Sequence, residues 1–368
     1  MSATKETTLT IDFKKLKHNF EFLKSKLQSN TKVLAVVKAF AYGSDAEEVA
    51  KELQELNIDY FAVAYTNEGI ALRKAGIHKP ILVLHPQPIN FKEIIDNCLE
   101  PSLYSFRVLN EFISVSKKLN QNNYPVHIKF NTGLNRLGFI AKDVEAITQT
   151  TNQASNVNVT SIFSHLAASE DSNELNFTKK QIDRFKKIRQ EFNRLSNHQP
   201  FAHLCNTSGI LNYTEAHLDM VRTGIGLYGF GNDVKFNKEL QPIASLTSVI
   251  SQIHTLQIGD SLGYNRAYIA KETTKTATIP IGHADGIGRQ YGNGIGNVII
   301  NNQKAAIIGN VCMDMIMVDI TNINCTEGDE VIIYNGDFTA SEFSKSVTSI
   351  SYEIITATSQ RIKRVFCR

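Results

Sequence analysis

Several lysine, arginine, histidine and small polar residues occur where short apolar runs of the sequence end. They are Lys38, Lys129, Arg136, His165, Asn206, Thr207 and Arg222. Lys38 directly follows the apolar run 33–37. An amine at the end of a buried strand is shielded from water, which lowers its pKa and suits it to Schiff-base formation. Lys38 is therefore a candidate for covalent attachment of a carbonyl cofactor; the alternative is a rim lysine whose ammonium group reaches solvent.

A glycine-rich segment, Gly-Ile-Gly-Leu-Tyr-Gly at 224–229, follows the last of these apolar runs. Its spacing matches a dinucleotide-binding loop, but it does not open a βαβ unit, and no well-placed acidic residue follows about twenty positions later. Glycines allow backbone N–H groups to approach a phosphate, and the Thr207 hydroxyl is a further donor. We interpret the segment as a phosphate site; a tight turn at the end of a domain is the alternative.

The elements that must position these residues repeat along the first part of the chain. Apolar strand candidates alternate with amphipathic helical patterns, at 33–37, 60–64, 80–85, 101–104, 126–130, 159–165, 201–206 and 218–222. Eight such units are what a (β/α)8 barrel requires, and residues at the carboxyl ends of its strands face the active site. An open doubly wound sheet is the competing α/β architecture.

The sequence pattern changes after about residue 241, where short strand candidates alternate with Asn, Gly and Asp turns. These strands are expected at 249–256, 276–280, 298–300, 304–308 and 315–320, followed by a single helix over 340–356. We therefore expect an α/β fold with a TIM-like barrel over 1–236 and a C-terminal, mainly β domain over 237–368. About the first ten residues could instead pair with the β domain.

Composition excludes several classes of function. The chain has 368 residues with 42% hydrophobic residues and a formal net charge of +3, which gives no reason to expect nucleic acid or a membrane surface as partner. The basic stretch 179–194 alternates with apolar residues, as on the solvated face of a helix. Its five scattered cysteines include no CxxC pair, so neither a metal site nor a disulfide framework is expected. A cytoplasmic location is expected, because the start of the sequence lacks a signal-like apolar core.

Five sequence blocks, in order, resemble those of bacterial alanine racemases, which are fold-type III pyridoxal-phosphate enzymes. Three lie in the expected barrel, at 35–43 (AVVKAFAYG), 131–139 (NTGLNRLGF) and 220–229 (MVRTGIGLYG). The other two, at 263–264 (GY) and 311–314 (VCMD), lie in the expected β domain. The resemblance covers almost the whole chain.

The resemblance implies a role for each matching residue. Lys38 would hold pyridoxal 5′-phosphate as a Schiff base and act as the base on one face of the substrate Cα, and Tyr264 of a second subunit would serve the other face. The residues implied in cofactor binding are Lys38, Tyr42, Arg136, His165, Asn206, Thr207, Arg222, Gly224, Ile225 and Tyr352. Arg136 and Met313 would also contact the amino-acid substrate. A homodimer that supplies D-alanine for peptidoglycan is implied as well.

Arg222 favours racemisation over other reactions of the cofactor. In the resembled family this arginine faces the pyridine nitrogen, and a guanidinium donates hydrogen bonds and disfavours a second proton there. An unprotonated pyridine is a weaker electron sink, so a proton is returned to Cα. Racemisation needs acid–base groups on both faces, which Lys38 and Tyr264 would supply.

The chain departs from the family pattern near the site. Phe40 stands where Asn or Asp is usual, Ser44 where His is common, and His283 where many members have a tyrosine at the substrate entrance. His283 could widen or recharge that entrance, or fill the same space by packing. A broad-specificity racemase is therefore one alternative function. A decarboxylase of this fold is disfavoured by Arg222, and a non-catalytic pyridoxal-phosphate carrier by the β domain. Lys129 aligns with a lysine that is carbamylated in some members, and its state is left open.

Overall fold

The computed structural model describes residues 6–236 and 238–368. The chain divides into two compact units. One comprises residues 17–41 and 46–240, and the other comprises residues 1–16, 42–45 and 241–368. The boundary expected between residues 236 and 237 touches Asn237, which lies outside the described residues. The structure's own division falls four residues later, between Leu240 and Gln241.

Eight parallel strands close into a barrel, which confirms the expected fold and excludes the open sheet. The strands, in order around the barrel, are β2 (Lys32–Val36), β3 (Tyr60–Val63), β4 (Ile81–Val83), β5 (Glu100–Leu103), β6 (Tyr124–Lys129), β7 (Val157–Phe163), β8 (Phe201–His203) and β9 (Met220–Thr223). The closing pair is β2 with β9, in which Leu34 lies opposite Arg222.

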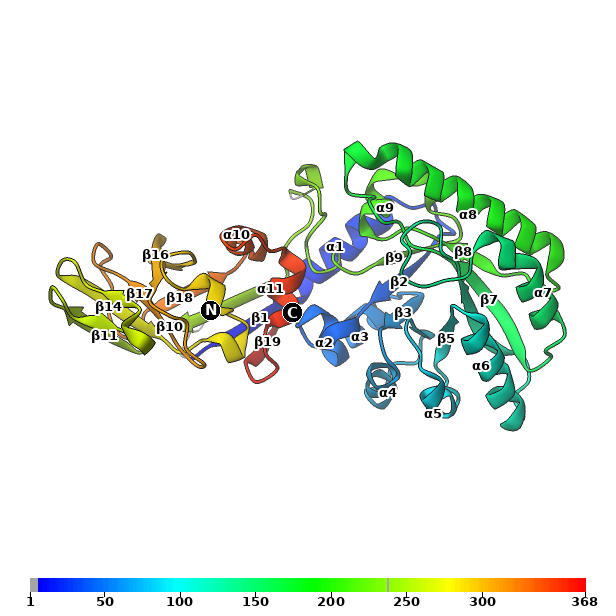
Figure 1. Cartoon of the computed structure of the whole chain (residues 1–368), viewed down its shortest axis with the longest axis horizontal. Coiled ribbons are helices and arrows are strands. Elements are labelled where there is room, and N and C mark those ends of the chain that lie inside the picture. The colour runs from blue at the N-terminus through cyan, green and yellow to red at the C-terminus, as the bar shows by residue number, and fades with distance from the viewer. Residues whose placement is uncertain (1–5, 237) are drawn as a thin grey trace. The chain divides into compact units, whose positions relative to one another are not determined.

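Within the described part of the chain, seven helices follow barrel strands and lie outside them (Figure 1). They are α3 (Ala46–Glu55), α4 (Thr66–Lys74), α5 (Phe91–Asp96), α6 (Phe106–Lys118), α7 (Val144–Asn152), α8 (Leu175–Leu195) and α9 (Thr207–Asn212). Helix α1 (Phe13–Ser25) precedes β2, and α2 (Lys38–Tyr42) is a single irregular turn after it. Helix α6 shows why the outer helices form. Ser105 caps its first turn by accepting from the Val108 N–H, and Val108 and Phe112 share a buried face at helical spacing.

The interior of the barrel is a packed core. Leu34, Tyr60, Ala62, Leu82 and Met220 form a buried cluster of side chains from β2, β3, β4 and β9. Such layers of side chains fill a barrel of eight strands. Functional side chains are consequently confined to the strand ends, unless they are themselves packed and hydrogen-bonded within this core.

The second unit is built on a nine-stranded sheet of order β11-β14-β17-β16-β15-β18-β10-β1-β19. Its strands are β1 (Thr8–Asp12), β10 (Ala244–Val249), β11 (Gln252–Leu256), β14 (Thr274–Ile279), β15 (Asn297–Ile300), β16 (Gln303–Ile308), β17 (Ile316–Asp319), β18 (Glu330–Tyr334) and β19 (Lys363–Cys367); β12 (Ser261–Leu262) and β13 (Tyr268–Ile269) form a separate pair. Strand β1 lies between β10 and β19, so this N-terminal segment belongs to the β unit.

Two expectations for this unit are wrong. The single strand expected over 249–256 is two strands, because the chain changes partners at Ile250: β10 pairs with β18, and β11 pairs with β14. The single helix expected over 340–356 is two, α10 (Ala340–Lys345) and α11 (Ser351–Ala357). The backbone between them includes Thr348 at a φ of 54°, a left-handed conformation that no right-handed helix accommodates. Among the described residues, no helix has the length and apolarity needed to cross a membrane.

Candidate functional site

Five of the predicted site residues influence one another electrostatically at the carboxyl ends of the barrel strands. Burial lowers the pKa of His165 well below its usual value, and the nearby charges of Arg222, Arg136, Lys129 and Lys38 lower it further. We call these five residues the cationic cluster. Because like charges repel in a partly buried site, the cluster is suited to bind an anion.

Lys38 has the electrostatic surroundings expected of a nucleophilic amine. Burial and the nearby charge of Arg136 lower the pKa of Lys38, while Glu68 acts in the opposite direction. Burial, Arg136 and Arg222 also lower the pKa of Lys129, to about 8. A substantial fraction of the Lys129 amine is therefore unprotonated at mildly alkaline pH, and the pKa of Lys38 is shifted in the same direction.

The segment that follows Lys38 has an unusual backbone. Ala39, Phe40, Ala41 and Tyr42 all have positive φ values, between 50° and 55°, and Gly43 continues at 82°. This is a left-handed turn, which is sterically costly for residues that carry a Cβ. Such strain persists only where surrounding contacts enforce it, and it is concentrated at functional sites.

Glu68, which was not among the predicted site residues, supplies those contacts. Its carboxylate accepts from the N–H groups of Ala39 and Ala64 at 2.7 Å each and of Tyr65 at 3.0 Å. It thus joins the end of β3 to the segment after Lys38. The signal that could have identified it is its position in the first turn of the helix after the second barrel strand, next to the lysine loop.

Arg222 is almost completely buried, at 4% exposure, and four groups fix its guanidinium. It donates to His203 Nδ1 at 2.8 Å, to the carbonyl oxygens of Ser164 at 2.7 Å and Leu204 at 3.0 Å, and to His165 Nδ1 at 3.1 Å. Burial lowers its pKa to about 10, so the guanidinium remains charged at neutral pH. His203 ends β8 and was not among the predicted site residues; those predicted near β8 lie after that strand.

The glycine-rich segment at 224–229 is packed against Thr207. The Thr207 hydroxyl accepts from the Gly226 N–H at 3.2 Å and lies 3.1 Å from the Thr223 hydroxyl. A Cβ at Gly226 would lie 2.6 Å from Thr207 Cγ2, so the approach requires glycine. Gly224 and Ile225 are buried beside it. Asn206 is the N-cap of α9, because its side-chain oxygen accepts a hydrogen bond from the Gly209 N–H at 2.8 Å.

The remaining predicted residues belong to the β unit. Tyr42 and Tyr352 have ring centroids 6.0 Å apart. Tyr264 is 73% exposed and Met313 is 58% exposed. The Tyr264 carbonyl accepts from the Asn310 side chain at 3.1 Å, which ties the two exposed segments together.

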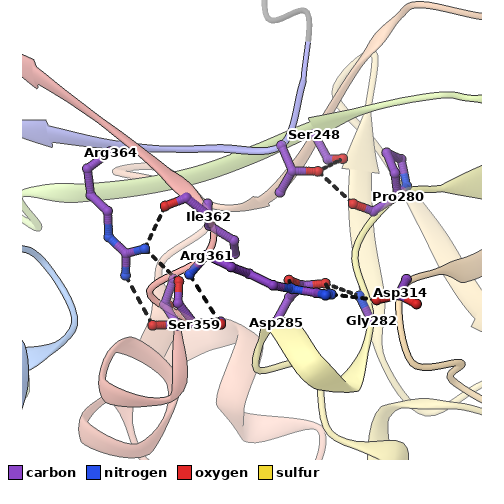
Figure 2. Close-up of polar contacts among 11 residues, drawn as sticks. Ser248, Pro280, Gly282, Asp285, Asp314, Ser359, Arg361, Ile362 and Arg364 are labelled. Atoms are coloured by element: carbon purple, nitrogen blue, oxygen red, sulfur yellow. Dashed lines mark hydrogen bonds and ion pairs between the residues drawn. The ribbon is translucent and has the colours of Figure 1, made fainter.

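Ion pairs from Arg361 hold the backbone segment that follows Met313. Arg361 binds Asp285 through two bonds, at 2.7 and 2.9 Å, and Asp314 at 2.7 Å (Figure 2). His283, in the turn held by Asp285, is exposed and donates its backbone N–H to Cys312. Tyr264, His283 and Met313 are therefore on connected segments of one unit. No group of three or more potential metal-ligating side chains occurs within residues 6–236 and 238–368.

Comparisons with known proteins agree with this geometry. Residues 11–231 match the model of the alanine racemase N-terminal domain, and residues 243–366 match that of the C-terminal domain. The alanine racemase of Halothermothrix orenii is 34% identical over 371 residues, covering 99% of this chain and 97% of the relative.

Solved structures give the same result. The alanine racemase of Clostridium difficile 630 has a TM-score of 0.92 and 32% identity, and the alignment covers 100% of this chain and 97% of the other. The alanine racemase of Bartonella henselae, determined with covalently bound pyridoxal phosphate, has a TM-score of 0.90 and 27% identity over 98% of this chain and 99% of the other. Because the models of both domains match and a relative of 34% identity covers nearly the whole chain, this chain belongs to the alanine racemase family.

Proposed function

We propose that this protein is an alanine racemase, which interconverts L- and D-alanine with pyridoxal 5′-phosphate attached to Lys38. The observation that carries the proposal is the placement of the Lys38 amine, with its lowered pKa, in the cationic cluster at the mouth of the barrel. Membership of the family supports it, as does the bound pyridoxal phosphate of the Bartonella henselae relative.

The residues present fit this cofactor. Lys38 offers an amine for its aldehyde, and the cationic cluster offers positive charge for its phosphate and phenolic oxygen. We assign the phosphate to Thr207, Gly224 and Ile225, with Tyr42 and Tyr352 from the β unit and Asn206 at the start of α9. When bound, the cofactor withdraws electrons from the amino-acid Cα and makes its proton removable.

Arg222 directs that chemistry toward racemisation. Its guanidinium would donate toward the pyridine nitrogen of the bound cofactor and, because it stays charged, would disfavour a proton on that nitrogen. The proton removed from Cα is then returned to Cα. Arg136 would contact the phenolic oxygen and the substrate carboxylate, and His165 would lie beside the ring.

Two groups on opposite faces of Cα exchange the proton. Lys38 Nζ accepts or returns it on one face, and its lowered pKa favours the neutral amine that this step requires. We assign the other face to the phenolic oxygen of Tyr264 of a partner subunit, with Met313 lining the substrate site. Both side chains are largely exposed in the single chain, as residues that act in another subunit's site must be. The proposal therefore includes a homodimer.

A broad-specificity racemase is the second candidate. It is favoured by His283, an exposed residue on a segment whose backbone N–H groups donate to the carbonyl oxygens of Cys312 and Met313. A smaller ring than tyrosine at the entrance would admit longer amino acids. Serine, lysine and arginine should be assayed beside alanine; comparable kcat/KM values for these amino acids would favour this candidate.

Family membership also supports a cytoplasmic location and a supply of D-alanine for peptidoglycan, which we include in the proposal. Deletion of the gene in its host should then create a requirement for D-alanine. Growth without D-alanine, in a host with no second racemase, would contradict this part.

The direct test is cofactor trapping with isotope exchange. The protein purified with pyridoxal phosphate should be yellow, borohydride should fix the cofactor on Lys38, and L-alanine in deuterated water should yield D-alanine labelled at Cα. Lys38→Arg should abolish trapping, while Lys32→Arg at the other end of β2 should not. A colourless protein that labels no alanine would overturn the proposal.

The assignment of Tyr264 to the partner has its own test. Mixed dimers of Lys38→Ala and Tyr264→Phe subunits should regain activity, since one site of each hybrid has both native residues. Random mixing gives about a quarter of the native sites. Tyr268→Phe is the matched control and should retain full activity. Failure to regain activity in dimers shown to be mixed would overturn the assignment.

A further inference from the structure

A line of polar side chains crosses the interior of the barrel. It uses one residue from each of five consecutive strands: Glu100 of β5, His127 of β6, Ser161 of β7, His203 of β8 and Arg222 of β9. The successive contacts are Glu100 Oε2 to His127 Nε2 at 2.6 Å, His127 Nδ1 to Ser161 Oγ at 2.6 Å, Ser161 Oγ to His203 Nε2 at 3.0 Å and His203 Nδ1 to Arg222 Nη1 at 2.8 Å.

These groups are withdrawn from solvent. His127, Ser161 and His203 have no exposed surface, and Glu100 is 8% exposed at the start of β5, the end of the barrel opposite the cationic cluster. Aromatic rings surround the line: Phe163 stacks on His203 at a centroid distance of 4.8 Å, and Tyr60 meets the edge of His127 at 6.1 Å. Buried polar groups in such surroundings are costly unless each is hydrogen-bonded.

The fixed donors in the line determine the direction of every bond. A guanidinium only donates, so His203 Nδ1 accepts from Arg222, and the neutral imidazole carries its proton on Nε2. That proton is donated to Ser161 Oγ. In the described structure Ser161 Oγ has two partners, so its own proton is donated to His127 Nδ1.

The bond between His127 and Glu100 has the same direction. With Nδ1 accepting, His127 carries its proton on Nε2 and donates it to the Glu100 carboxylate. Burial and the neighbouring Glu100 raise the pKa of Tyr60, so its phenol stays protonated beside that carboxyl group. All bonds therefore run from the Arg222 cation to the Glu100 anion, and the carboxylate compensates the buried positive charge at the far end.

We propose that Glu100, His127 and Ser161 are positioning residues, which form with His203 a directed hydrogen-bond relay that fixes the tautomer of His203 and the orientation of the Arg222 guanidinium. His203 can accept from Arg222 only while its proton is on Nε2, and Ser161 and Glu100 maintain that tautomer. The inference rests on the proposed function only for the kinetic part of its test.

The primary test is the tautomer itself, measured by ¹⁵N NMR on the purified holoprotein labelled at histidine. Spectra of His127→Gln and His203→Gln variants assign the signals. Both imidazoles of the native protein should carry the proton on Nε2. A proton on Nδ1 of His203 would overturn the proposal. This measurement is made on the native protein, so it does not depend on the folding of a variant that breaks the relay.

The second test breaks the relay. Ser161→Ala should remove the fixed tautomer of His203, shift the absorption band of the bound cofactor and lower kcat about tenfold, the effect of one lost buried hydrogen bond, with little change in KM. Glu100→Gln, which keeps an acceptor but removes the charge, should have a smaller effect in the same direction.

Ser102→Ala is the matched control. Ser102 is a buried serine on β5, opposite His127 in the strand register, and its hydroxyl has no hydrogen-bond partner in the described structure. It should leave the NMR signals, the absorption band and kcat unchanged. Equal effects of Ser161→Ala and Ser102→Ala would overturn the relay. The two outcomes are distinguishable. If both histidines have the proposed tautomers but the protein racemises no amino acid, the proposed function is wrong and the relay still stands.

Discussion

The Glu68 carboxylate accepts a hydrogen bond from the backbone N–H of Ala39 at 2.7 Å, immediately after Lys38. The same carboxylate binds the N–H groups of Ala64 and Tyr65 at the end of β3. Two neighbouring strands of the barrel thus share one anionic acceptor, and the left-handed turn after Lys38 is fixed by a residue thirty positions away in the chain. The position of the Lys38 amine depends on this contact.

Glu68→Gln should weaken cofactor binding. The amide offers one acceptor oxygen in place of two, and its NH₂ group faces backbone donors, so at least one charge-assisted bond, of about 1.5–3 kcal/mol, is lost. Loss of the carboxylate should also lower the pKa of Lys38 further. The dissociation constant of pyridoxal phosphate, measured by absorbance titration, should rise at least tenfold. Glu55→Gln, at an exposed site on α3, should leave it unchanged; a normal constant for Glu68→Gln would refute the assigned contact.

Ala39→Gly should stabilise the protein. Ala39 is exposed and has a φ of 53°, where a Cβ costs about 1–2 kcal/mol and glycine has no such cost. After the entropy that glycine loses on folding, a gain of about 0.5–1 kcal/mol remains. Chemical denaturation should show a higher urea midpoint. Ala71→Gly inside the right-handed helix α4 should lower it, and a decrease for both variants would rule out a left-handed turn at Ala39.

Lys129 should react with cyanate before the surface lysines. With its pKa lowered to about 8, the free-amine fraction near neutral pH is on the order of 100-fold greater than that of an ordinary lysine. Peptide mass spectrometry after brief treatment at pH 7.5 should find carbamylation at Lys129 well ahead of exposed Lys142. Equal rates at the two lysines would contradict the lowered pKa. The untreated protein, analysed in the same way, shows whether Lys129 is modified when isolated.

Gly226→Ala distinguishes a phosphate site from a simple turn. The new Cβ would displace Thr207 and contact Leu23 Cδ1 at 3.0 Å. If the segment binds phosphate, the folded variant should bind pyridoxal phosphate at least tenfold more weakly. If it is only a turn, thermal stability should fall while the dissociation constant stays the same. Gly336→Ala, whose Cβ would meet only Lys15 Nζ at 3.5 Å, controls for the added methyl group.

The stability of the fold should decrease as the pH falls below about 6.5. Burial, Arg222 and His127 hold the pKa of His203 well below its usual value, so the unfolded chain takes up a proton there that the folded protein does not. The contribution of His203 to the free energy of unfolding is fully present above the pKa that this histidine has in the unfolded chain. It is lost as the pH falls toward the lower pKa of the folded protein, by up to about 1.4 kcal/mol per pH unit. His165 acts in the same direction. Urea unfolding between pH 7.5 and 5 should show this slope.

A variant identifies the origin of that slope. His203→Asn should reduce it by the contribution of one histidine, while His254→Gln, at an exposed site on β11, should not change it. A stability that rises as the pH falls would contradict the pKa shifts of both buried histidines.

The sequence by itself determined the barrel and the end of it at which the reactive residues lie. Apolar runs and helical spacing are local properties, and in a parallel barrel every strand's carboxyl end reaches the same rim. Counting strands therefore placed Lys38, His165 and Arg222 in one region without any knowledge of contacts. The sequence pattern was less informative for the β unit, where the break at Ile250 depends on which strands become neighbours.

Only the tertiary structure decided what surrounds these residues. The left-handed turn after Lys38 exists because Glu68, from another strand–helix unit, binds its backbone, and alanine and phenylalanine give no local signal for such a conformation. The contacts from Arg222 through His203 and Ser161 to His127 and Glu100 join five strands. Hydrogen bonds of this kind depend on barrel register and on burial, which a linear pattern of residues does not specify.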